Sequence, residues 1–150
     1  MNTSRMQRHI LVAATLVAAV ATVGSLYFRY GMGLFPCELC WFQRIFMYPL
    51  VIVLGVAAVE NRGAVYRTVL PVATIGWLIA AYHSYAQVAG DSLVCSSFCA
   101  SIQYQLFGVL TIPNLSLIAF SMILVLVGSL AFEARRTATE TTDPERVGSD

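Results

Sequence analysis

The composition of this chain excludes an ordinary soluble domain. Of its 150 residues, 58% are hydrophobic and 11% are charged, with a mean hydropathy of +0.73, whereas soluble domains carry about 25% charged residues. The net charge is +1, so electrostatics give no reason to expect a nucleic-acid partner. We therefore predict an integral membrane protein.

Four stretches are apolar over a membrane-spanning length, at about residues 10–28, 41–59, 68–90 and 112–132. A helix needs about 20 residues to cross the ~30 Å hydrocarbon core, and backbone groups in lipid must be satisfied within the span. The first stretch is longer than the core of a signal peptide, so we expect it to be retained. The fold class predicted is an all-α integral membrane protein, with a four-transmembrane-helix bundle as one domain over residues 1–134.

The basic residues, all of which are Arg, predict the orientation of the bundle. Six of the nine flank alternate ends of the spans, namely Arg5 and Arg8, Arg62 and Arg67, and Arg135 and Arg136, whereas Arg29 and Arg44 lie near the opposite face. Because basic residues favour the cytoplasmic side, we expect a multi-pass protein of the cell membrane with cytoplasmic N- and C-termini. The loops at about 29–40 and 90–111 then face outward. Residues 135–150 are polar and Thr-rich, and we predict a disordered cytoplasmic tail there.

The first outward loop ends in a pair of cysteines, Cys37 and Cys40. Pro36 suits a first helical turn, so the second helix is expected to begin at or just after it. A helix N-terminus lowers the pKa of a thiol, and Arg44 lies on the same helical face as Cys40. We expect Cys40 to be the better stabilised thiolate and Cys37 the more exposed sulfur. A structural disulfide or half of a zinc site is the alternative for the pair, and an arginine extended to lipid head groups is the alternative for Arg44.

The second outward loop carries the other pair, Cys95 and Cys99. A bridge over this spacing is strained in a regular helix, which makes it easier to reduce. Both pairs thus lie on the outer face, where disulfides form and persist. Apolar residues then recur at helical spacing over residues 98–107, which predicts a short interfacial helix, with a packed loop as the alternative.

His83 lies within the third span. A titratable side chain at membrane depth is costly to bury, so it is a candidate for hydrogen bonding or proton transfer. The alternative is a core histidine bonded to a neighbouring helix.

Three segments together resemble one known family. Residues 36–49 read PCELCWFQRIFMYP, residues 81–85 read AYHSY, and residues 107–113 read FGVLTIP. The first segment is similar to the signature of the DsbB family of disulfide bond formation proteins, in particular its BdbC-like branch. The resemblance covers about residues 10–132.

The resemblance implies a protein-disulfide oxidoreductase that sustains disulfide bond formation in exported proteins. It would reoxidise an extracytoplasmic thioredoxin-like dithiol oxidase (DsbA-like) and pass two electrons to a membrane quinone of the ubiquinone or menaquinone type. Cys37 and Cys40 match the pair coupled to the quinone, and Cys95 and Cys99 match the pair that exchanges with the partner. Arg44 and His83 match positions beside the quinone.

Three other functions remain open from the sequence. A small transporter would need a charged residue deep in a span, and His83 is the one titratable candidate of that kind. A zinc-stabilised scaffold would use the cysteines as ligands. A quinone oxidoreductase like vitamin K epoxide reductase also has four helices, but its Cys-x2-Cys is expected late in the chain.

Overall fold

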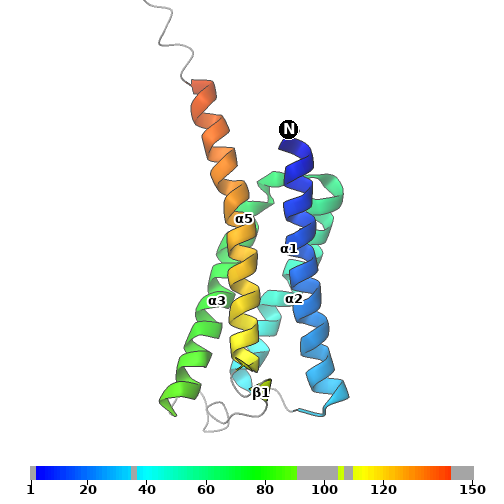
Figure 1. Cartoon of the computed structure of the whole chain (residues 1–150), viewed down its shortest axis with the longest axis vertical. Helices are drawn as coiled ribbons and strands as arrows, with labels where there is room; N and C mark the ends of the chain where they lie inside the picture. The colour runs from blue at the N-terminus through cyan, green and yellow to red at the C-terminus, as the bar shows by residue number, and fades with distance from the viewer. Residues whose placement is uncertain (1–2, 35–36, 91–104, 107–109, 143–150) are drawn as a thin grey trace, which may run out of the picture.

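The computed structural model describes residues 3–34, 37–90, 105–106 and 110–142, and it consists mainly of four long helices (Figure 1). The elements in chain order are α1 (Thr3–Leu26), a π-helical turn η1 (Tyr27–Gly31), α2 (Glu38–Glu60), a 3-10 turn η2 (Gly63–Val65), α3 (Tyr66–Ala89), β1 (Gln105–Leu106), β2 (Leu110–Thr111) and α5 (Ile112–Thr142). All four helices are long and apolar enough to cross a membrane. The predicted four-helix membrane bundle is confirmed.

The four helices form a closed ring of neighbours. α1 packs on α2, α2 on α3, α3 on α5 and α5 on α1. The N-terminus of α1 and the C-terminal part of α5 lie at the same end of the bundle (Figure 1), as an even number of spans requires. The cysteine-bearing start of α2 and the end of α3 lie at the opposite end.

Apolar side chains occupy both the inside and the outside of this bundle. The largest fully buried side chains include Phe120, Leu11, Leu50, Leu54 and Ile123. Many other large apolar side chains are exposed along the helices, among them Val20, Val59, Val88 and Val125. A helix that is hydrophobic all round is typical of a membrane span, so the exposed apolar faces are the lipid-facing surface.

The last helix is longer than we predicted. α5 continues to Thr142, so the first part of the tail predicted to be disordered, residues 135–142, is helical, while residues 143–150 lie outside the described part of the chain. Alanine, glutamate and arginine at residues 133–136 are good helix formers, and no glycine or proline lies between Gly128 and Pro144. The guanidinium of Arg136 also lies 4.6 Å from the centre of the Phe132 ring. Local helix propensity thus extends the helix despite the polar composition.

The interfacial helix predicted over residues 98–107 falls almost wholly outside the described residues and stays a prediction. Its described residues, Gln105 and Leu106, form β1, which pairs antiparallel with β2. This two-stranded pairing leads directly into α5.

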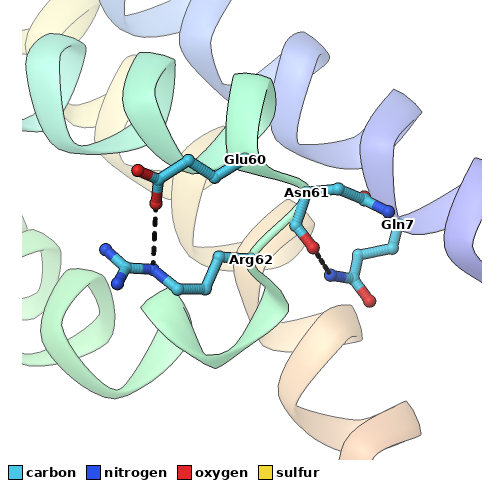
Figure 2. Close-up of polar contacts among 4 residues, drawn as sticks. All are labelled: Gln7, Glu60, Asn61 and Arg62. Carbon is cyan, nitrogen blue, oxygen red and sulfur yellow. Dashed lines mark hydrogen bonds and ion pairs between the residues drawn. The ribbon is translucent and has the colours of Figure 1, made fainter.

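The turn between α2 and α3 is fastened to α1 at the end of the bundle that carries the termini (Figure 2). Asn61 ends α2 in the left-handed conformation, with φ of 53°, and its carbonyl oxygen accepts a 2.9 Å hydrogen bond from Gln7 Nε2. An added Cβ at Gly63 would lie 2.5 Å from the same Gln7 side chain. The Glu60–Arg62 ion pair beside it, at 3.4 Å, is exposed and contributes little. A side chain at position 63 would therefore displace the flexible end of Gln7 from this hydrogen bond.

The contact between α3 and α5 provides a test of the packing. Gly76 faces the ring of Phe120, and a Cβ at residue 76 would overlap that ring. We expect Gly76→Ala to destabilise the bundle by about 1–3 kcal/mol, because Phe120 is fully buried and cannot move aside. Thermal unfolding in detergent micelles measures this. Gly128→Ala is the matched control, since a Cβ there meets nothing within 4 Å and alanine favours a helix; equal melting temperatures for the two variants would contradict the packing.

Candidate functional site

The two cysteines of the first pair lie at the start of α2. Cys37 is the N-cap residue, with extended backbone at φ −70° and ψ 169°, and Cys40 is in the first helical turn. The helix therefore begins just after Pro36, as predicted. The Sγ atoms are 2.7 Å apart, so a small movement brings them to the ~2.05 Å of a disulfide bond. The pair can alternate between a dithiol and a disulfide without rearrangement of the helix.

The exposure of the two sulfurs is the reverse of our prediction. Cys37 is buried, with 8% of its surface exposed, whereas Cys40 is only partly buried. Cys37 and Leu39 pack against Ile79 and Tyr82 of α3, a contact that the spacing within α2 does not reveal. The expectation that Cys37 is the more exposed sulfur was wrong.

A buried histidine from α3 contacts the first cysteine. His83 is 2% exposed, and its Nε2 lies 3.6 Å from Cys37 Sγ. Hydrogen bonds from the Cys40 thiol and then from His83 lower the pKa of Cys37 below its usual value, against the effect of burial. Our expectation that Cys40 is the better stabilised thiolate did not include this contact of Cys37 with His83, and it stays a prediction.

One residue of this site was missed from the sequence. Gln43 is 4% exposed, and its Nε2 lies 3.1 Å from His83 Nδ1. An amide at membrane depth is costly unless it is hydrogen-bonded, so a glutamine within a mainly apolar span was the available signal. It lies on α2 one residue before Arg44.

A cavity of about 570 Å³ lies beside Cys40. Its walls come from α1, α2 and α5, and it is mainly apolar. The polar residues in the lining are Ser25, Cys40, Gln43, Arg44, Tyr48 and Ser116. A largely apolar cavity with a few polar groups, in this size range, is typical of a small-molecule site. Cys40 thus connects a redox-capable pair to a cavity at membrane depth.

Arg44 lines the same cavity. Its Nη2 donates a 3.1 Å hydrogen bond to the carbonyl oxygen of Ser25 on α1, just before the π-helical turn. The guanidinium has five N–H donors in a planar fork, so this one bond leaves donors for a ligand. The side chain is held against α1 at the cavity wall.

His83 does not line this cavity. The sequence placed both Arg44 and His83 beside the same ligand, but the structure separates them: Arg44 faces the cavity and His83 faces Cys37. The bonds to Gln43 and Cys37 also fit the alternative of a core histidine paired with a neighbouring helix.

The same atoms form a possible metal site. Cys37 Sγ, Cys40 Sγ and a His83 ring nitrogen all lie within 4.8 Å of one another, and two thiolates with one imidazole are a known zinc ligand set. Two sulfurs on one tetrahedral zinc ion lie about 3.7 Å apart, given Zn–S bonds of ~2.3 Å. The observed 2.7 Å is shorter, so the pair would have to open to bind zinc.

The second cysteine pair, Cys95 and Cys99, lies outside the described residues, and its role stays a prediction. α3 ends at Ala89 and is capped by Gly90, which has a positive φ of 70° and donates its N–H to the carbonyl oxygen of Ala86. α5 begins at Ile112. The end of α3 and the start of α5 lie at the same end of the bundle as the start of α2 (Figure 1).

Comparisons with known proteins agree on one family. The family model described as disulfide bond formation protein DsbB matches residues 7–130. Disulfide bond formation protein C of Bacillus subtilis is 45% identical over 120 residues, which cover 77% of this chain and 87% of that protein. A probable disulfide formation protein of Deinococcus radiodurans is 40% identical over 78% of this chain and 85% of its own length. The probable disulfide formation protein C 1 of Bacillus anthracis is 39% identical over 83% of this chain and 94% of its own length. No solved structure gives a significant match.

Proposed function

Because this chain belongs to the DsbB family of disulfide bond formation proteins, it is a multi-pass membrane disulfide oxidoreductase, and we propose that its electron acceptor is a membrane quinone. The electron donor in this proposal is an extracytoplasmic thioredoxin-like dithiol oxidase (DsbA-like). Family membership favours this function over a transporter or an enzyme like vitamin K epoxide reductase.

The observation that most strongly supports a quinone as the acceptor is that Cys40 and Arg44 line the same apolar cavity. A quinone is an apolar ring with two carbonyl oxygens, and it gains negative charge on those oxygens as it is reduced. The apolar walls suit the ring and an isoprenoid tail. The fixed positive charge of Arg44 suits the oxygen on which charge develops. Ubiquinone and menaquinone share this chemistry.

The electron path in this proposal runs from the partner to the cavity. A partner thiolate attacks the Cys95–Cys99 disulfide at Cys95, and the released Cys99 exchanges with Cys37. Cys40 then leaves as a thiolate beside the quinone. The partner's second thiolate then releases Cys95, which re-forms its bond with Cys99 and frees Cys37 as a thiolate. When Cys37 and Cys40 form their disulfide again, the two sulfurs give up two electrons, and the quinone takes them with the two protons that the partner's thiols released. His83 contacts Cys37 and not the cavity, so we do not assign it to the quinone.

The orientation belongs to the same proposal. Both termini lie in the cytoplasm and both cysteine pairs lie on the outer face. The Arg residues near the termini and between α2 and α3 support this, and disulfide exchange needs an oxidising compartment.

Quinone reduction by the purified protein tests the proposal. The protein in detergent is mixed with a reduced thioredoxin-like dithiol protein, and the absorbance of soluble ubiquinone and menaquinone analogues is followed. We expect quinone loss and disulfide gain in a one-to-one ratio, and only with enzyme present. Dithiol oxidation without loss of either quinone would contradict the proposed acceptor.

A zinc-stabilised protein is the second candidate, because the Cys37, Cys40 and His83 donors lie within 4.8 Å. Under the redox proposal we expect less than stoichiometric zinc in the purified protein and an unchanged melting temperature after chelation. Elemental analysis and thermal unfolding measure these. One zinc ion per chain, with a large fall in melting temperature on its removal, would favour the scaffold, since structural zinc contributes directly to folding.

A further inference from the structure

The contacts of His83 assign it a partner other than the quinone. From them we infer that Gln43 holds His83 in the tautomer whose Nε2–H donates to the Cys37 sulfur, and that His83 thereby keeps Cys37 ready to close the Cys37–Cys40 disulfide. This deepens the proposed function and rests on it. His83 and Gln43 are then positioning residues for Cys37.

The hydrogen bonds determine the tautomer. The atom of Gln43 that faces the ring is the amide nitrogen Nε2, which is 3.1 Å from His83 Nδ1. An amide nitrogen only donates, so Nδ1 is the acceptor and the neutral ring carries its proton on Nε2. That Nε2 is the atom 3.6 Å from Cys37 Sγ. The chain of donors therefore runs in one direction, from Gln43 through His83 to the sulfur.

Burial makes this chain of hydrogen bonds effective. Gln43, His83 and Cys37 are all buried, and a hydrogen bond is stronger at low dielectric, while an unpaired polar group there is costly. Among the described residues, Cys37 contacts the titratable groups of Cys40 on α2 and of His83 and Tyr82 on α3, and the exposed Glu38 follows it in the chain. Of these, His83 is the donor that keeps its proton through the cycle, because Cys40 must give up its own.

The chemistry requires such a donor. Disulfide closure joins Cys37 and Cys40 as thiolates: the S–S bond forms, two electrons pass to the quinone, and the quinone takes two protons. A protonated Cys37 cannot take part. The Nε2–H of His83 stabilises the Cys37 thiolate and is not consumed. The same bond also stabilises Cys37 as the leaving thiolate when its mixed disulfide with Cys99 is resolved.

Alkylation of Cys37 tests the inference without quinone or partner. Cys40, Cys95 and Cys99 are replaced by serine in the full chain, and the rate of alkylation by iodoacetamide is followed against pH in detergent. We expect His83→Leu to raise the midpoint of the profile by about one pH unit, a tenfold loss of thiolate below the midpoint. An unchanged midpoint would overturn the inference. Failure of quinone reduction would not affect this readout, so the two proposals fail separately.

Conservative variants distinguish a role of His83 in positioning the hydrogen bond to Cys37 from a purely structural role. In His83→Gln the amide nitrogen takes the place of the ring Nε2, so we expect the wild-type profile to be restored. In His83→Asn the shorter amide stops near the Nδ1 position, so this variant should behave like His83→Leu. Ser84→Ala, at the next residue of α3, is the control and should leave the profile unchanged. Equal shifts in all four variants would mean that the histidine only supports the fold.

The tautomer itself can be observed. The chain has two histidines, so a His9→Gln background leaves His83 alone in a long-range ¹H–¹⁵N spectrum of the reduced protein. We expect the Nε2–H tautomer in this background and a mixture of tautomers when Gln43→Leu is added. A ring protonated on Nδ1 in the unmodified site would overturn the role of Gln43.

Discussion

Cys40→Ser is expected to abolish quinone reduction, with a loss on the order of 10³-fold or more. Cys40 is the sulfur that lines the cavity, and it lies 2.7 Å from Cys37 Sγ. Serine has nearly the same shape, so the fold should be retained, but its hydroxyl cannot form a disulfide or give up electrons to a quinone. The measurement is quinone absorbance with a reduced dithiol protein as donor, beside a melting curve that reports the fold.

Cys95→Ser is the informative companion to Cys40→Ser. It should also stop turnover with a dithiol protein, because the proposed entry point for electrons is lost. Turnover driven by a small dithiol such as dithiothreitol should persist, since such a molecule can reduce the Cys37–Cys40 pair directly. Cys40→Ser should fail with both donors. Undiminished turnover in both variants would exclude the proposed mechanism.

Arg44→Ala is expected to lower quinone reduction by about 100-fold, in line with the loss of one fixed donor to a developing negative charge. The guanidinium lines the cavity with Cys40 and is held by the Ser25 carbonyl. Thiol–disulfide exchange with the partner should remain largely intact, because that exchange does not involve the cavity. Single-turnover exchange and steady-state quinone reduction, measured on the same sample, separate the two steps.

Arg29→Ala is the control for Arg44→Ala. Arg29 lies in the π-helical turn at the same end of the bundle, carries the same charge, and does not line the cavity. We expect its quinone reduction to stay within a few-fold of wild type. If Arg44→Ala changed only expression or membrane insertion, an arginine that anchors the protein at the head groups would be the better explanation.

The first site residues could be predicted because their signals are local. Cys37, Cys40 and Arg44 follow one another within two helical turns, and Pro36 indicates where the helix starts. The same kind of local signal predicted the start of α5 at residue 112. The prediction of a disordered tail was wrong for residues 135–142, because it relied on their polar composition although these residues favour a helix.

The parts of the site that come from two helices could not be predicted in the same way. His83 is 46 residues from Cys37 and 40 from Gln43, and each residue along an α-helix turns the side-chain direction by about 100°. A small rotation of α3 would have aimed His83 at another helix or at lipid. Apolar residues lie on nearly all sides of the third span, so its sequence does not indicate which face turns inward.

The sequence by itself determined the membrane setting, the number of helices, the family and the residues able to do redox chemistry, because hydropathy, spacing and motifs are properties of the chain. Only the tertiary structure decided which of those residues meet. It buried Cys37 against α3, opened a cavity beside Cys40 between α1, α2 and α5, and turned His83 toward a sulfur. These outcomes depend on how the helices rotate and pack against one another, and packing is a property of the assembled bundle.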